Sequence, residues 1–327
     1  MSKLVDLVLN TPGRMALPIG VYAGLEMTGA TVRQAVSDPI AQSEAVLALN
    51  EHFHTPLMLT AMDLSAESET FGCEIRMADD EIPTVIGRRV TTAAEIAALP
   101  NPKAGDLRTA VHLEAARRLV ASGKAPVLGG LIGPFSLAAR IFGVSEALEA
   151  TAVDPELILS LLEKVTDFLV GYTRAFREAG AIGVIMAEPA AGLLSPRGLA
   201  RFSAPFANRI FSEVQTEDFS AILHNCGAKI AHFPKVIESG AAVYHFGAPM
   251  DILAALQQAD RHVILAGNLD PSAVFYAGTP ETVYAQTAAL AKSVKTYPNF
   301  ILSSGCDLPP GTPVRNLEAF YQAVKDA

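Results

Sequence analysis

Cysteines are few in this sequence and long uncharged runs are absent, and each shortage excludes a class of protein. Only 3 of 327 residues are cysteine, and this odd, small number predicts a reducing compartment and argues against a disulfide framework. The longest uncharged run, 125–139, is too short and too rich in glycine and proline to span a bilayer. Asp6 interrupts the apolar stretch at the N-terminus, which makes it a poor signal peptide. We therefore expect a cytoplasmic protein without a membrane partner.

Concentrated positive charge is also missing. The chain has 25 Lys and Arg against 34 Asp and Glu, a net charge of −9, and it contains no basic block or stripe of arginine and aromatic residues. Nucleic-acid-binding proteins neutralise phosphates with such clusters, so we expect no nucleic-acid partner. Half of the residues, 50%, are hydrophobic, which is ample for a large core.

Short apolar runs alternate with longer segments of helical period. Two of these segments, 155–178 and 280–294, each begin with proline after a capping residue, Asp154 or Thr279. Repeated alternation of strand and helix predicts the α/β class and a parallel (β/α)8 TIM barrel. The alternative is a doubly wound sheet, but no Gly-x-Gly-x-x-Gly turn follows an early strand. The eight predicted strands are 18–22, 57–62, 126–131, 182–187, 219–223, 242–246, 263–266 and 300–303.

One segment departs from this alternation. Residues 67–99 include Pro83 and Gly87 and are predicted to form a hairpin-like insertion. The residues ahead of the first predicted strand form an N-terminal extension. No linker, repeat or low-complexity tract divides the chain, so we expect a single domain over 1–327.

His224, Cys226 and Cys306 are the side chains most typical of a metal site. The first two follow the predicted strand 219–223, and Cys306 follows 300–303. In a parallel barrel the active site lies at the carboxyl ends of the strands. Zinc suits a mixed set of imidazole and thiolates, and three ligands plus an exchangeable position describe a catalytic site. We predict one zinc ion per chain; the alternative is a surface histidine and two buried free cysteines.

Carboxylates are expected at the same strand ends. Glu188 ends an uncharged run, and a buried carboxylate needs a cation or several donors. It is predicted to be catalytic and a fourth, labile zinc ligand; the alternative is a carboxylate that accepts hydrogen bonds from loop N–H groups. Asp63 precedes Glu67 and Glu69, and these acids could bind a cation or act as acid or base, with Asp63 as the catalytic candidate. A solvated loop is the better account of at least two of the three.

Further polar residues near the predicted strand ends are candidates for substrate contact. Tyr22 lies in the first loop, and Asn268 follows a predicted strand. His245 lies near the end of the predicted strand 242–246, and a hydrogen-bonded core histidine is the competing interpretation. The candidate substrate-binding residues are Tyr22, Glu67, His245 and Asn268.

Several motifs resemble the uroporphyrinogen decarboxylase superfamily. Gly267-Asn-Leu-Asp-Pro271, followed by Gly278-Thr-Pro-Glu281, is similar to the superfamily as a whole. Four further motifs are similar to the zinc methyltransferase branch of this superfamily. They are His224-Asn-Cys226-Gly227, Ser304-Gly-Cys306-Asp-Leu-Pro-Pro-Gly-Thr312-Pro313, Asp63-Leu-Ser-Ala-Glu67-Ser-Glu69-Thr-Phe-Gly72 and Ala187-Glu188-Pro189-Ala-Ala-Gly-Leu-Leu-Ser195-Pro196. The resemblance covers nearly the whole chain and implies a (β/α)8 barrel.

The resemblance also implies methyl transfer between a corrinoid and a small molecule. Some members of this branch methylate a thiol of the coenzyme M or homocysteine type, and others take a methyl group from a methoxylated aromatic compound; both directions stay open. The base-off cobalamin signature Asp-x-His-x-x-Gly is missing, since Asp260-Arg-His262-Val-Ile-Leu265 lacks the glycine. A separate corrinoid-binding protein is therefore the expected partner.

Two other functions are compatible with the superfamily. Uroporphyrinogen decarboxylases carry an arginine-rich N-terminal segment that binds substrate carboxylates, whereas 18–29 contains no arginine here. That reaction needs no metal, which leaves the His-x-Cys pair and Cys306 unexplained. A non-catalytic zinc-binding barrel is the other alternative, and it predicts a closed four-ligand site without a pocket. Some relatives have Asp where this chain has Glu188.

Overall fold

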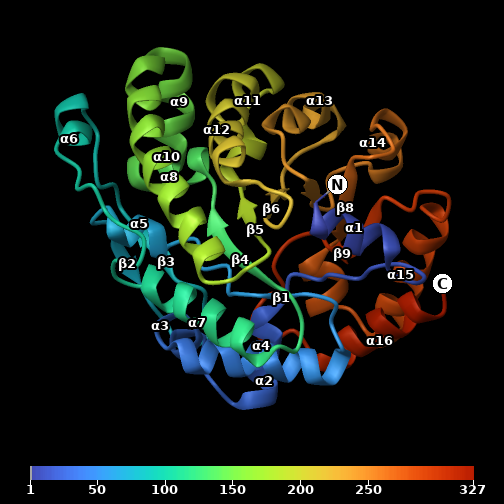
Figure 1. The fold of residues 1–327 in the computed structure, drawn as a ribbon. Helices are drawn as coiled ribbons and strands as arrows, with labels where there is room; N and C mark the ends of the chain where they lie inside the picture. Colours follow the sequence, from blue (N-terminus) through green and yellow to red (C-terminus); the bar gives the residue numbers. More distant parts are fainter. Residues whose placement is uncertain (1) are drawn as a thin grey trace.

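The computed structural model describes residues 2–327, in which helices surround a curled parallel sheet (Figure 1). Its strands pair side by side in the order β1-β4-β5-β6-β7-β8-β9, and every pairing in this sheet is parallel. A doubly wound sheet would reverse its strand order, so the TIM-barrel prediction is confirmed. The strands of the sheet are β1 (Met58–Leu59), β4 (Val127–Ile132), β5 (Gly183–Ala187), β6 (Ser220–Asn225), β7 (Val243–Phe246), β8 (Ile264–Leu269) and β9 (Phe300–Ser304).

Helices follow most of these strands and return the chain to the start of the next one. The α-helices are α1 (Lys3–Asn10), α2 (Leu25–Thr28), α3 (Val32–Ser37), α4 (Pro39–Phe53), α5 (Ala66–Thr70), α6 (Ala93–Ala97), α7 (Thr109–Ser122), α8 (Pro134–Phe142), α9 (Val144–Val153), α10 (Pro155–Glu178), α11 (Pro196–Phe202), α12 (Ala204–Val214), α13 (Phe233–Val236), α14 (Ile252–Gln258), α15 (Pro280–Ser293) and α16 (Val314–Lys325). Short 3-10 turns are η1 (Val21–Gly24), η2 (Ala190–Leu193), η3 (Ile230–His232) and η4 (Ile237–Ser239), and η5 (Pro271–Tyr276) is a π-helical turn. The predicted capping residues are confirmed, since Asp154 accepts from Leu157 N and Thr279 from Thr282 N.

The prediction of a strand at 18–22 is wrong. The eighth position of the barrel is instead filled by a short extended segment in which Ala16 pairs in parallel with Leu302 of β9. Leu17 N donates to Leu302 O at 2.9 Å, and Leu302 N donates to Met15 O at 3.0 Å. The ladder stops at Pro18, which has no N–H to donate, and the chain turns into η1. The first strand is therefore reduced to a single bridge.

The insertion and the extension lie at different ends of the barrel. The predicted hairpin is confirmed, because β2 (Glu74–Arg76) and β3 (Thr84–Ile86) pair antiparallel between α5 and α6. The N-terminal helix α1 lies beside the start of β6, where Lys3 N donates to Glu217 O at 2.8 Å. The extension thus covers the amino end of the barrel, away from the strand ends expected to carry the site.

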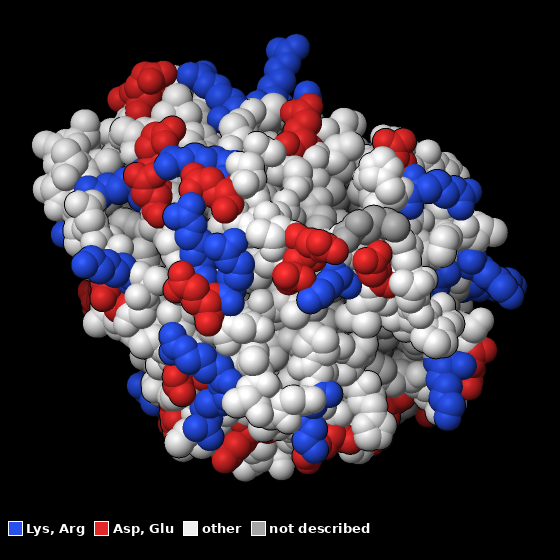
Figure 2. Space-filling model, viewed as in Figure 1, with Lys and Arg blue, Asp and Glu red and all other residues white. Residues whose placement is uncertain are grey.

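The central strands are buried along their whole lengths. Every residue of β4, β5, β6, β7 and β9 is buried, as expected for parallel strands covered on both faces. On the face shown in Figure 2, positive and negative side chains are interspersed and form no large patch of one sign. Within residues 2–327, no helix combines the length and apolar composition needed to cross a membrane.

Candidate metal centre and its cavity

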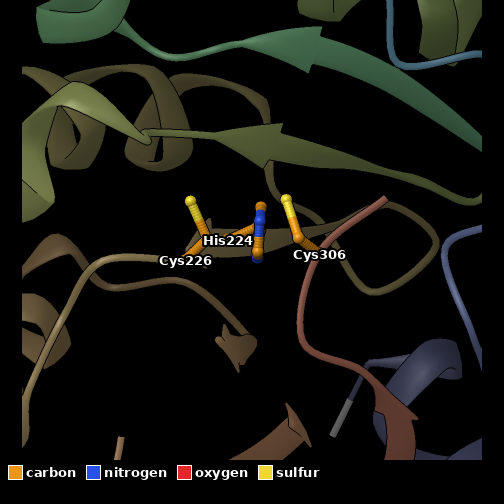
Figure 3. A group of neighbouring side chains, drawn as sticks. All are labelled: His224, Cys226 and Cys306. Carbon is orange, nitrogen blue, oxygen red and sulfur yellow. The ribbon is translucent and has the colours of Figure 1, made fainter. Parts of the chain in front are cut away.

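His224, Cys226 and Cys306 come together at the carboxyl end of the barrel. His224 is the penultimate residue of β6, Cys226 follows this strand directly, and Cys306 lies two residues after β9. One potential ligand atom from each lies within 4.8 Å of the other two. The imidazole of His224 lies between the two cysteines, whose sulfurs point to the same side (Figure 3). The structure therefore assembles three metal-competent groups that 80 residues of sequence separate.

A chain of hydrogen bonds leads from His224 into the barrel. His224 Nδ1 lies 2.8 Å from His245 Nδ1, and His245 Nε2 lies 2.8 Å from Ser303 Oγ. Ser303 Oγ donates to the Leu17 carbonyl at 2.5 Å, so it can only accept from His245 Nε2–H. Burial first, and then the nearby His224, keep the pKa of His245 well below its ordinary value. A neutral His245 must therefore offer its Nδ1 lone pair to His224.

The direction of this chain determines which nitrogen of His224 is available. If His224 donates through Nδ1–H, its Nε2 carries a lone pair. That Nε2 is buried and has no hydrogen-bond partner. Metal-bound histidines ordinarily donate their other ring nitrogen to a protein acceptor, and His245 supplies such an acceptor here. The unprotonated Nε2 of His224 is thus the nitrogen that is available to bind a metal together with the two cysteines.

The two cysteines differ in acidity although both are reduced. The hydrogen bond from Cys306, together with His224, lowers the pKa of Cys226 well below that of a free thiol. The same contact and burial raise the pKa of Cys306. Cys226 is therefore the more acidic of the two thiols and the first to lose its proton. Such a pair is suited to lose its remaining proton to a cation.

A cavity of about 240 Å³ opens beside these groups. Its walls include His224, Cys226 and Cys306, and most of the remaining wall is apolar. Two charged side chains, Arg140 and Asp307, also border it. The other lining residues are Met62, Leu64, Ile82, Pro83, Ala187 and Pro189. A metal in this position would face a space large enough for a small molecule.

Glu188 lies next to the site but is held by α8. Its Oε1 accepts from Phe135 N at 2.9 Å, and its Oε2 accepts from Ser136 N at 2.9 Å and Ser136 Oγ at 2.7 Å. Burial raises its pKa to about 7 despite these donors. This arrangement matches the alternative of a carboxylate that accepts N–H groups, and Glu188 is not in the metal-competent group. Its role as a fourth ligand stays a prediction.

The interpretation of the Asp63–Glu69 acids as mostly solvated is wrong. Asp63 and Glu67 are buried. Arg108 forms an ion pair with Asp63, and its Nε donates to Glu69 at 2.8 Å. Glu67 Oε1 accepts from Ile132 N at 3.0 Å, and burial raises the Glu67 pKa to about 7. Arg108 directly precedes α7 and belongs to none of the motifs or predicted strands. Only the folded structure therefore shows that it neutralises the charge of Asp63 and Glu69.

The remaining candidates lie outside the residues that line the cavity. Tyr22 is buried, and its hydroxyl has no hydrogen-bond partner. Asn268 Nδ2 donates to Met250 O at 2.8 Å and Gly247 O at 3.2 Å, which ties β8 to the loop after β7. His245 is the hydrogen-bonded core histidine of the competing interpretation. Substrate contact by Tyr22, Glu67, His245 and Asn268 stays a prediction.

Sequence reasoning missed Arg140 and Ser303. Arg140 is the single charge in the apolar segment Phe135–Phe142 of α8, and this isolation could have drawn attention to it. Nothing in the sequence around Ser303 sets it apart, because serine is common at the ends of strands. Its partner His245 lies on β7, two strands away from β9 in the sheet.

A family comparison agrees with this architecture. The model of the uroporphyrinogen decarboxylase (URO-D) family matches residues 14–327. The chain belongs to the URO-D family. The match begins just before the extended segment at Ala16 and continues to the last residue, so it includes the whole barrel and leaves out α1.

Curated relatives include methyltransferases and decarboxylases. The methylcobamide:CoM methyltransferase MtbA of Methanosarcina acetivorans is 30% identical over 311 residues, covering 92% of this chain and 89% of the relative. A methylated-thiol–coenzyme M methyltransferase of Methanosarcina mazei is 28% identical and covers 81% of this chain and 71% of its own. A uroporphyrinogen decarboxylase of a Synechococcus species is 28% identical, over 62% of this chain and 58% of its own. Of these three relatives, MtbA matches over the largest share of the chain.

Solved structures confirm the fold. A methyltransferase from Methanosarcina mazei superposes with a TM-score of 0.85 at 21% identity, covering 99% of this chain and 97% of its own. A B12-independent methionine synthase from a Shewanella species gives a TM-score of 0.58 at 14% identity, with coverage of 95% and 94%. At these identities the likeness concerns the barrel itself.

Proposed function

We propose that this URO-D family chain is a zinc-dependent methyltransferase that moves a methyl group from a corrinoid, carried by a separate protein, to a small thiol. The observation that carries the proposal is the group His224, Cys226 and Cys306, whose ligand atoms lie within 4.8 Å of one another and border a cavity. Support also comes from the two relatives named as coenzyme M methyltransferases.

The donor set fits zinc. The Nε2 atom of His224 is buried and has no hydrogen-bond partner. Because leaving a buried polar atom unpaired costs free energy, this nitrogen is a suitable metal ligand. Two thiolates and one imidazole are a mixed soft set that zinc accepts in tetrahedral sites. Three protein ligands leave one position for substrate, which is the composition of a catalytic rather than a structural site.

The chain's own residues prepare the thiol for attack. When bound, zinc supplies a Lewis acid that lowers the pKa of a substrate thiol. The apolar walls, among them Met62, Leu64 and Ala187, limit access of water to the cavity. The negative charge of Cys226 and Cys306 keeps the site electron-rich, which favours a nucleophilic sulfur. The net reaction converts a thiol and methyl-Co(III) into a thioether, Co(I) and a proton.

The size of the cavity argues against a tetrapyrrole substrate. The cavity of about 240 Å³ is larger than the roughly 150 Å³ cavity that accommodates one benzene ring. A macrocycle of four pyrrole rings needs several times the volume of that benzene cavity. The segment 18–29 also lacks the arginines that would bind the carboxylates of a porphyrinogen. A purely structural zinc site does not account for a cavity beside the ligands.

The test is methyl transfer by the zinc-loaded chain under anaerobic conditions. Free methylcobalamin serves as donor, the formation of cob(I)alamin is followed by absorption, and the thioether is identified by mass spectrometry. We expect turnover that chelation abolishes and zinc restores, and a large gain in rate when the cognate corrinoid protein replaces free methylcobalamin. Turnover by the metal-free chain at an unchanged rate would refute the proposal.

A further inference from the structure

Arg140 presents an unpaired positive charge to the cavity. It lies in the last turn of α8 and lines the same space as His224, Cys226 and Cys306. A guanidinium group has five N–H donors and no acceptor. Within residues 2–327, no side-chain or backbone oxygen accepts a hydrogen bond from Arg140, and no carboxylate lies within ion-pair distance of it. None of its nitrogens is sealed from solvent, so the group opens onto the cavity.

The other arginines that are not exposed all have partners. Arg14 donates to the carbonyls of Val294, Tyr297 and Phe300, and Arg108 pairs with Asp63 and Glu69. Arg177 donates to Val214 O at 3.1 Å. The arginines without partners, Arg89, Arg197 and Arg315, are exposed to water instead. Among the arginines of residues 2–327, only Arg140 is partly buried and has no hydrogen-bond acceptor.

Nearby acids do not neutralise this charge by contact. Asp63 and Glu67 are close enough to influence the pKa of Arg140, which burial lowers. Asp63 is already engaged by Arg108 and Ser65, and Glu67 Oε1 accepts from Ile132 N. A partly buried guanidinium with unused donors is expensive to maintain unless a ligand uses them.

We propose that Arg140 binds the anionic oxygens of the substrate, a carboxylate or sulfonate at the far end of a small thiol whose sulfur reaches the metal-competent group. This inference rests on the proposed function and adds the substrate's charge. The planar fork of arginine matches carboxylate and sulfonate oxygens. A cavity of about 240 Å³ holds a short chain between the two ends, and its walls, which are apolar apart from Arg140, Asp307 and the metal-competent residues, strengthen the charge interaction.

Charged and uncharged thiols of similar size separate this role from a structural one. The acceptors are 2-mercaptoethanesulfonate, 3-mercaptopropionate and uncharged 2-mercaptoethanol, with methylcobalamin as donor. We expect Arg140→Met to raise KM for the two anionic thiols about 10- to 100-fold, the factor for losing a charged hydrogen-bonded contact, and to leave KM for 2-mercaptoethanol within a factor of about two. Arg140→Lys should recover part of the loss, and exposed Arg117→Met should change neither.

A second measurement needs no turnover. Metal-free wild-type protein should bind ethanesulfonate or propionate in NMR titrations, and Arg140→Met should not. Equal losses for charged and uncharged thiols, or no anion binding by the folded wild type, would overturn the proposal. If no thiol is methylated but ethanesulfonate still requires Arg140, the anion site stands and the thiol acceptor of the proposed function fails.

Discussion

His224 and His245 are direct neighbours in the register of β6 and β7, and their Nδ1 atoms meet at 2.8 Å. Only one of two such nitrogens can hold the proton. Because Ser303 Oγ is committed to the Leu17 carbonyl, the proton lies on His224 Nδ1. Ser303 on β9 therefore sets the protonation of both histidines and leaves Nε2 of His224 free to act as a ligand.

The first prediction concerns this pair. His245→Leu removes the acceptor of His224 Nδ1–H, and we expect zinc affinity to fall about 10- to 100-fold, the usual effect of losing a hydrogen bond to a ligand histidine. Affinity is measured by competition with a chromophoric chelator. His112→Leu, which changes another buried histidine outside the cavity lining, is the control. Nitrogen NMR of the metal-free protein should show His224 protonated at Nδ1 and His245 at Nε2; the opposite tautomers would contradict the argument.

The second prediction concerns Cys306. Cys306→Ala leaves only two of the three ligands, and we expect the purified protein to lose most of its zinc while the barrel core remains folded. Metal content is measured by mass spectrometry, and folding by circular dichroism. Cys73→Ala is the matched control, since Cys73 is buried in the core and its thiol pKa is raised to about 11 by burial. Full zinc content in Cys306→Ala would remove this residue from the site.

The third prediction concerns the stability of metal-free protein. Glu188→Gln keeps the size of the side chain but replaces one of the two oxygens that accept three hydrogen bonds from Phe135 and Ser136. The amide NH2 of glutamine cannot accept a hydrogen bond, and leaving a buried donor unpaired should lower the free energy of unfolding by about 1–3 kcal/mol at about pH 5, where the raised pKa keeps the native carboxyl largely uncharged. Urea unfolding measures the change. Ser136→Ala, which removes one donor, should cost less, and an unchanged midpoint for Glu188→Gln would show that α8 does not depend on the carboxylate.

The fourth prediction is a pH dependence that involves Glu67. Burial raises its pKa from 4.5 to about 7 in the folded chain, so the folded state binds this proton more tightly than the unfolded state. Stability is therefore greatest below about pH 4.5 and falls as pH rises toward 7, by about 3 kcal/mol for this group alone. Glu67→Gln should reduce that fall in urea unfolding of metal-free protein between pH 5 and 8, roughly. The same slope in both proteins would contradict the shift.

The sequence is enough to predict the barrel and the convergence of His224, Cys226 and Cys306. Apolar runs identify buried strands, and parallel strands necessarily bring their carboxyl ends to one edge. Pro18 shows the limit of this reasoning, because the apolar run 18–22 predicts a strand whereas its proline ends the ladder with β9.

Partner choice inside the barrel lies beyond such patterns. Arg108 neutralises Asp63, and Ser303 orients His245, through contacts that depend on register and side-chain rotamers across elements distant in sequence. Glu188 shows the same limit, because a carboxylate after a strand can either bind a metal or accept hydrogen bonds from a helix N-terminus. The position of α8 in the folded structure shows that Glu188 accepts three such bonds.

The short segment at Ala16 closes the ring of strands with a single bridge to β9, and the Leu17 carbonyl is also the last acceptor of the hydrogen-bond chain from His224. Closure of the barrel and orientation of the ligand histidine are thus thermodynamically linked. By reciprocity, a cation that orders His224 also strengthens the seam between the N-terminal segment and β9. The amides of Leu17 and Leu302, which hold that seam, should exchange with solvent more slowly once the centre is loaded.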